Sequence, residues 1–216
     1  MASTLRAAAL ALALSTAAAP VVMLPVAAQA QAARDAQAEA FVQTEATRAL
    51  GILADKNLSA AAKKQAFRAF VDQVADVPRV TGFVLGKYNR TITPAQRAAF
   101  APVFRDYASS VYETRLSDYK GESLKVVGST VRKPGDVIIS SQVVGGAQKE
   151  PVRVSWRVLK GDDGRWRVVD VEVAGVWLAI TQQQDFVSTI DNARGDINVL
   201  INQLKKQTAE GTVGKS

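Results

Sequence analysis

The spacing of apolar residues in this chain changes once, at Gly121. Before this glycine, apolar residues recur at the three- and four-residue intervals of amphipathic helices. Four alternating runs follow it, at about 121–132, 136–145, 151–160 and 164–174. Short turns that contain glycine separate these runs, so neighbouring strands should be antiparallel. Helical spacing returns after Gly175, and this order of helices, sheet and helices predicts the segregated α+β class.

The fourth run, 164–174, contains a slip in its alternation. Trp166 and Val168 are apolar at even-numbered positions, whereas Val169 and Val171 are apolar at the odd-numbered positions, which face the other side of a strand. Such a slip predicts a β-bulge, which bends a sheet. A bent sheet with an apolar inner face can enclose an apolar ligand, but an ordinary core strand has the same pattern.

Two carboxylates, Asp170 and Glu172, alternate with the valines of this run. Glycosidases use two facing acids, so a catalytic pair is one interpretation. Acidic side chains are seldom fully buried, however, and the pattern favours a solvated face.

The helices have clear start signals. They are expected at about 31–55, from Ser59, from Asp76 to Gly86, from Thr93 to about Tyr119, at 182–191 and from Asp196. The cleanest signal is Thr93-Pro94-Ala95-Gln96, in which Thr93 is the N-cap and Gln96 completes a capping box. Pro102 should either bend this helix or delay its start.

The chain contains no cysteine and no histidine. Their absence excludes disulfides, Cys-His and Ser-His-Asp catalysis and histidine-based zinc sites, and no metal or cofactor is expected. The net charge of +7 points to anionic lipid, an acidic protein or nucleic acid as a partner. Export would make nucleic acid the least suitable of the three.

Residues 1–30 are typical of a secretory signal peptide. They combine Arg6, an alanine- and leucine-rich run and the cleavage pattern Ala28-Gln29-Ala30. An uncleaved membrane anchor is the alternative, although two prolines interrupt the apolar run. We therefore predict a single domain over 31–207 and a disordered tail over 208–216.

Several segments together resemble the MlaC family of periplasmic phospholipid-binding proteins, also called the toluene-tolerance or Ttg2-type family. They are Leu85-Gly86-Lys87-Tyr88, Thr93-Pro94-Ala95-Gln96-Arg97, Phe100 to Phe104 with Tyr112 and Leu116, Tyr119 before Gly121, Gly164-Arg165-Trp166-Arg167-Val168 with Asp170-Val171, Gly175-Val176, and Asp196 to Leu204. The resemblance implies an NTF2/cystatin-like bent antiparallel sheet, packed by helices that enclose an apolar pocket.

The resemblance also implies a function. A soluble periplasmic carrier would shield the acyl chains of a phospholipid while it moves between an outer-membrane lipoprotein complex and an inner-membrane ABC transporter with an MCE-domain protein. Such a carrier maintains outer-membrane lipid asymmetry and is not an enzyme. A monomer is expected. The hopanoid-associated HpnM branch is similar over the same motifs, so a hopanoid is an alternative cargo. An NTF2-like enzyme acting on a small apolar substrate is a third interpretation.

Apolar residues on the inner parity of the strands and on the helices are the expected pocket wall. They are Phe83, Phe104, Tyr107, Val111, Val137, Ile139, Val152, Val154, Trp156, Val158, Val168, Val171 and Val173. Trp177 is added because the family commonly has a small polar residue there, and an indole would narrow the pocket mouth. Arg153 and Arg157 are expected to dock the partner protein, although solvated charge is the simpler interpretation.

Overall fold

A computed structural model describes residues 34–116, 120–146 and 150–210. The expected signal peptide, 1–30, and the last six residues of the expected tail lie outside these ranges. Across the described ranges, no helix combines the length and the apolar character that crossing a membrane requires.

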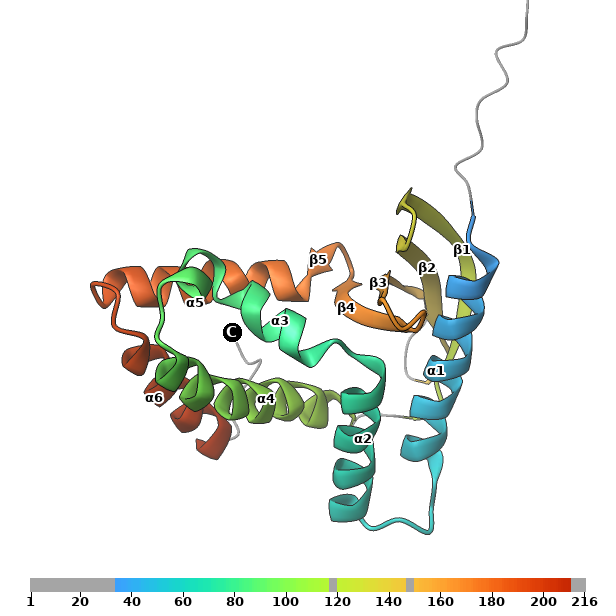
Figure 1. The fold of residues 1–216 in the computed structure, drawn as a ribbon. Helices are drawn as coiled ribbons and strands as arrows, with labels where there is room; N and C mark the ends of the chain where they lie inside the picture. The colour runs from blue at the N-terminus through green and yellow to red at the C-terminus, as the bar shows by residue number, and fades with distance from the viewer. Residues whose placement is uncertain (1–33, 117–119, 147–149, 211–216) are drawn as a thin grey trace, which may run out of the picture. The chain divides into compact units, whose positions relative to one another are not determined.

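Helices and strands are segregated along the chain (Figure 1). The first helices are α1 (Ala36–Ala54), α2 (Ala60–Val74), α3 (Val77–Val84), the 3₁₀ helix η1 (Gly86–Arg90) and α4 (Pro94–Leu116). The strands are β1 (Ser123–Lys133), β2 (Asp136–Val144), β3 (Val152–Lys160), β4 (Trp166–Val173) and β5 (Val176–Trp177). The last helices are α5 (Leu178–Asn192) and α6 (Ile197–Glu210). This is the predicted α+β fold. Helix α6 includes 208–210, which the sequence had assigned to the tail.

The starts predicted for α2, α3, α4 and α6 are confirmed, whereas α1 begins at Ala36 and not near residue 31. At the start of α4 the Gln96 backbone N–H donates to Thr93 Oγ1 at 3.2 Å, and the Thr93 N–H donates to Gln96 Oε1 at 2.9 Å, which is a complete capping box. Ser59 caps α2, and Asp76 caps α3. Because α4 begins at Pro94, Pro102 lies inside the helix and does not delay its start.

The strands form one antiparallel sheet in the order β1-β2-β3-β4-β5. Val158 of β3 is opposite Val168, and Arg157 is opposite Asp170, so Val169 is an extra residue in β4. The β-bulge predicted from the slipped alternation is therefore present at that position.

The sequence did not predict β5. Val173 pairs with Val176 across a two-residue turn, in which Ala174 has φ 50° and Gly175 has φ 90°. Positive φ at both positions is typical of the type I′ hairpin, which suits the twist of antiparallel strands. The turn brings the chain directly into α5, which begins at Leu178 and not near residue 182 as expected.

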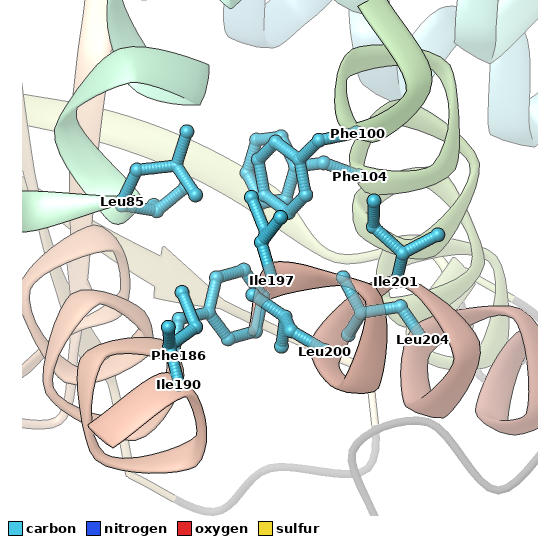
Figure 2. Close-up of a cluster of buried hydrophobic side chains, with 10 residues drawn as sticks. Leu85, Phe100, Phe104, Phe186, Ile190, Ile197, Leu200, Ile201 and Leu204 are labelled. Atoms are coloured by element: carbon cyan, nitrogen blue, oxygen red, sulfur yellow. The ribbon is translucent and has the colours of Figure 1, made fainter. Parts of the chain in front are cut away.

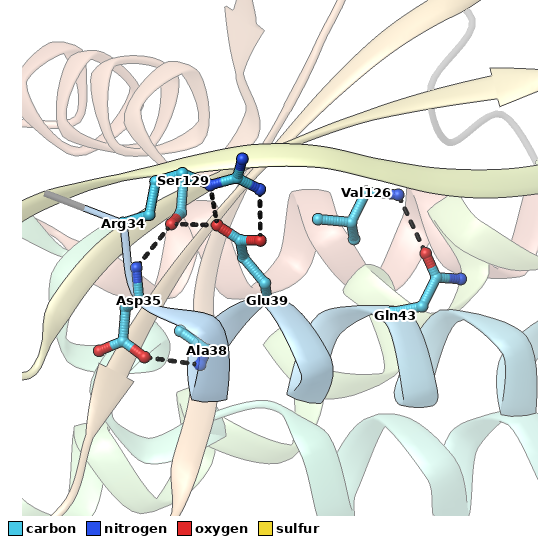
Figure 3. Close-up of polar contacts among 7 residues, drawn as sticks. All are labelled: Arg34, Asp35, Ala38, Glu39, Gln43, Val126 and Ser129. Carbon is cyan, nitrogen blue, oxygen red and sulfur yellow. Dashed lines mark hydrogen bonds and ion pairs between the residues drawn. The ribbon is translucent and has the colours of Figure 1, made fainter. Parts of the chain in front are cut away.

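Helix α1 packs on the sheet and contacts β1 and β2. Its Ala38 and Val42 form a buried cluster with Val137, Ile139 and Val158. Polar bonds fix the helix along β1 (Figure 3): the Val126 N–H donates to Gln43 Oε1 at 3.0 Å, and the Asp35 N–H donates to Ser129 Oγ at 2.9 Å. These bonds set the register between helix and strand.

A second core joins α3, α4, α5 and α6 (Figure 2). The Phe100 and Phe104 rings from α4 stack with centroids 5.7 Å apart, and Phe186 from α5 meets both rings edge-on. Ile197 and Leu200 of α6 are fully buried against this group. The helices therefore have a core of their own, distinct from the one beneath α1.

Candidate functional site

A cavity of about 320 Å³ lies where the helices meet the bulged strand. Its walls come from the end of α2, from α3, from α4, from β4 with Val176 of β5, and from the first turns of α5. The volume falls within the range of small-molecule sites in proteins. Most of the wall side chains are aliphatic or aromatic, so the cavity suits an apolar ligand.

The bulge in β4 helps to form this wall. Val168 makes a parallel bridge to Ala75, and its carbonyl oxygen accepts a hydrogen bond from the Asp76 N–H at 2.9 Å. Since β5 pairs only with Glu172 and Val173, the earlier part of β4 would otherwise be an open sheet edge. The link between α2 and α3 covers that edge and positions α3 over the cavity.

Asp170 connects β4 to α5. Its Oδ1 accepts hydrogen bonds from the N–H groups of Val171 and Ala179, both at 2.8 Å. The N-cap residue of α5, Trp177, makes no side-chain capping bond, so Asp170 supplies the cap from the neighbouring strand. Burial raises the pKa of the Asp170 carboxyl above its usual value, against the effect of these backbone bonds.

The expectation that Asp170 is solvated is therefore wrong. The side chain is half-buried and lines the cavity. Its environment is set by α5, which returns to β4 through the tight β5 turn. A pattern read within one strand does not contain that contact.

Helix α3 presents one face to the cavity. Val77, Val80 and Val84 are spaced three and four residues apart, and all three line it. Phe83 does not line the cavity, and 39% of its surface is exposed.

Polar groups gather at the exposed part of the cavity lining. Asp72 and Arg105 form an ion pair there, and Asp185 is a further exposed carboxylate. Tyr107 donates a hydrogen bond to Gln182 at 3.2 Å. Burial raises the pKa of Tyr107, and the negative charge of Asp185 raises it further. With Asp170, the lining holds three carboxylates and one guanidinium in a chain whose net charge is +7. At the exposed part, which we call the mouth, Asp185 is left in excess of the Asp72–Arg105 pair, so the mouth is acidic although the chain is basic.

The structure brings five of the fourteen residues predicted for lipid binding to this cavity. They are Phe104, Tyr107, Val111, Val168 and Val171.

The other nine do not line the cavity. Val137, Ile139 and Val158 are buried beneath α1, and Trp156 packs beside them with its indole N–H donating to Ser141 Oγ at 2.9 Å. Val154 is also buried. The remaining four, which are buried only in part or exposed, are Phe83, Val152, Val173 and Trp177. Contact of these nine residues with a lipid stays a prediction.

Trp177 lies next to the cavity in the sequence but does not line it. Its neighbour Val176 lines the cavity, and successive residues of a strand point to opposite faces. The indole expected to narrow the mouth is therefore not part of the cavity wall.

Sequence reasoning missed the contributions of α2, α3 and α5. Val77 and Val80 could have been found from their helical spacing with Val84. Leu178 and Ala179 had no such signal, because they line the cavity only when α5 begins directly after β5.

The two arginines predicted for docking have different environments. Arg157 bonds the Asp136 carboxylate through Nε at 3.1 Å and through an Nη nitrogen at 2.9 Å, and only 3% of the Asp136 side chain is exposed. Burial alone would raise the pKa of Asp136, but the hydrogen bonds and charge of Arg157, with the charge of Arg132, hold it below its usual value. Arg153 is exposed. Arg157 therefore has a structural partner, and docking by either arginine stays a prediction.

Within the described part of the chain, no group of three or more acidic side chains is placed to hold a metal ion. Comparison with protein families matches residues 28–206 to the MlaC protein family. Among solved structures, the chain is similar to a phospholipid-binding protein from Ralstonia solanacearum in complex with a phospholipid. The two share 26% sequence identity and superpose with a TM-score of 0.70, over 81% of this chain and 98% of the other.

Proposed function

Because this chain belongs to the MlaC family, we propose that it is a periplasmic carrier that holds the acyl chains of a phospholipid in the cavity between α3, α4, β4 and α5. It would take the lipid from one membrane complex and deliver it to the other, between an outer-membrane lipoprotein complex and an inner-membrane ABC transporter with an MCE-domain protein. This movement would maintain the lipid asymmetry of the outer membrane.

The observation that carries the proposal is the cavity itself. Its wall combines the valines of α3 with Val168 and Val171 of the bulged strand, while Asp72, Arg105 and Asp185 lie at the exposed part. A phospholipid has the same division between apolar chains and a polar headgroup. The structural neighbour from Ralstonia solanacearum was solved with a phospholipid bound, which supports the same class of ligand here.

The energetics favour a carrier of this kind. Some thirty methylene groups of a two-chain lipid would be exposed to water during transfer, at about 0.8 kcal/mol each, or ~24 kcal/mol in total. A protein that covers the chains removes most of this cost. The headgroup can stay in water at the mouth, so the site needs few polar contacts.

Native mass spectrometry of the protein purified from the periplasm tests the proposal. We expect a co-purifying mass that matches a phospholipid. A polycyclic lipid mass would instead identify a hopanoid carrier. Protein that is always empty, and that takes up no lipid from vesicles, would contradict lipid carriage of either kind.

Two tryptophan substitutions locate the ligand. Val80→Trp places an indole on the inner wall, and Thr181→Trp places one at an exposed position of the lining. Both should lower lipid occupancy. The control is Val199→Trp on α6, since Val199 is 45% exposed and does not line the cavity. Thermal melts followed by circular dichroism establish that each variant folds. Unchanged occupancy in folded Thr181→Trp and Val80→Trp would place the lipid elsewhere.

A further inference from the structure

A groove lies on the other side of α3 from the lipid cavity. Arg79, Phe83, Lys87, Arg90 and Arg97 line it, and we call these five residues the basic groove. They come from α3, η1 and the first turn of α4, with Gln183 of α5 completing the wall. The groove shares no lining residue with the cavity.

The positive charge of the basic groove is only partly balanced. Arg79 pairs with Asp76 at 2.9 Å, and Lys87 pairs with Asp191 at 2.7 Å. Arg97 donates to the backbone and side-chain oxygens of Asn89, which carry no charge.

Arg90 is exposed and forms no ion pair with any residue in the described ranges. The guanidinium of Arg90 is therefore available to an anionic partner, while the charge of Arg97, whose terminal nitrogens bond Asn89, adds to the positive field of the groove without a carboxylate to balance it.

The groove also holds an apolar contact. Phe83 is 39% exposed beside these cations, on the α3 face that turns away from the cavity. An exposed aromatic ring next to arginines is typical of protein interaction surfaces, where both residue types are enriched.

We propose that the basic groove docks an acidic segment of a partner protein, with a carboxylate on Arg90, an apolar side chain on Phe83, and the charge of Arg97 attracting the segment from beneath. The groove is shallow and open, so an extended segment can lie along it with one side chain against Phe83 and a carboxylate at Arg90. The proposal goes beyond lipid carriage, because it concerns a surface that the lipid does not occupy.

Helix α3 lies between the cavity and the basic groove and contributes residues to both. Val77, Val80 and Val84 of this helix form a cavity wall, while Arg79 and Phe83 of the same helix line the basic groove. A docked segment would therefore lie directly against the helix that covers the lipid.

The first test uses a labelled synthetic peptide rich in glutamate with interspersed leucines, added to the full-length mature protein and followed by fluorescence anisotropy. Arg90→Glu should weaken binding about fivefold at low salt, since it removes one attraction and adds one repulsion. Phe83→Ser should weaken it at every salt concentration. High salt should weaken wild-type binding.

The matched control is Arg165→Glu. Its side chain is 82% exposed in the turn before β4, and it does not line the groove. This variant has the same change in net charge, so it should bind the peptide as the wild type does. Equal weakening by the two charge reversals would mean that only net charge matters, and would overturn the proposal. Lack of peptide binding by the wild type would overturn it as well.

Sedimentation with phosphatidylglycerol vesicles tests whether the groove binds a membrane surface and not a protein. If Arg90 were needed for vesicle binding while the peptide did not bind, the groove would be a membrane surface and not a protein-docking site. Lipid occupancy is measured on the same variants by native mass spectrometry and should not change with Arg90→Glu. The two proposals are therefore tested separately. Absence of peptide binding would contradict docking but not lipid carriage, and absence of bound lipid would contradict lipid carriage but not docking.

Discussion

Replacing Arg157 by methionine should destabilise the protein through Asp136. The methionine keeps an apolar stem but leaves a carboxylate that is 3% exposed without its principal partner. Loss of one member of a buried ion pair costs about 3–5 kcal/mol. Arg157 itself is 34% exposed, and Arg132 remains 3.6 Å from Asp136. We therefore expect a loss of unfolding free energy below that range, about 2 kcal/mol at neutral pH.

The stability loss in Arg157→Met should depend on pH. The pKa of Asp136 is lowered in the folded wild type, so the pair contributes stability above the usual carboxyl pKa. That contribution disappears as the pH falls through the lowered pKa. In Arg157→Met, burial acts with less opposition and raises the pKa of Asp136. The stability difference between variant and wild type should therefore shrink as the pH falls from neutral to about 3.

The assay is urea unfolding followed by tryptophan fluorescence, with the m-value fitted for each variant. Arg153→Met is the control on the same strand, because Arg153 is exposed, and it should change stability by less than about 0.5 kcal/mol. Adding Asp136→Asn to Arg157→Met should recover much of the loss by removing the buried charge. The reasoning is refuted if Arg157→Met costs no more than Arg153→Met, or if the second substitution recovers nothing.

Three further predictions concern the cavity and the helix starts. Asp185→Lys makes the acidic mouth less negative, so phosphatidylglycerol should gain occupancy relative to phosphatidylethanolamine in native mass spectrometry, whereas the control Asp162→Lys in the turn before β4 should leave the ratio unchanged. Asp170→Ala should lower the free energy of unfolding by about 2 kcal/mol, because it removes the cap of α5. Asp170→Asn keeps an acceptor without a buried charge and should unfold near the wild-type urea midpoint, so equal loss in both variants would contradict the capping role. Thr93→Ala should cost about 1 kcal/mol in the same assay, whereas Thr93→Ser, which keeps the hydroxyl, should cost little.

Local geometry explains what could be predicted from the sequence. The capping box at Thr93 depends on residues three positions apart, and the bulge at Val169 depends on a slip within one strand. Neither requires knowledge of the rest of the chain. The fold class follows from the same kind of information, because helices and strands each impose their own spacing on apolar residues.

The sequence did not distinguish cavity wall from core. Val158 and Val168 are opposite each other in the sheet, yet Val158 is fully buried in the cluster beneath α1 while Val168 lines the cavity. Both are valines in alternating runs. Val168 packs against the same cluster, but it is only partly buried there and also lines the cavity beside Ala75. That difference depends on contacts between segments far apart in the chain.

By itself, then, the sequence determined the order of helices and strands, the capped starts of α2, α3 and α4, the bulge in β4, and that histidine and cysteine chemistry is absent. Only the tertiary structure decided that Asp170 caps α5, that Arg157 is held by Asp136, and that α3 separates an apolar cavity from the basic groove. The physical reason is range. Spacing and capping act within a few residues, whereas burial and ion pairing depend on which distant segments pack together.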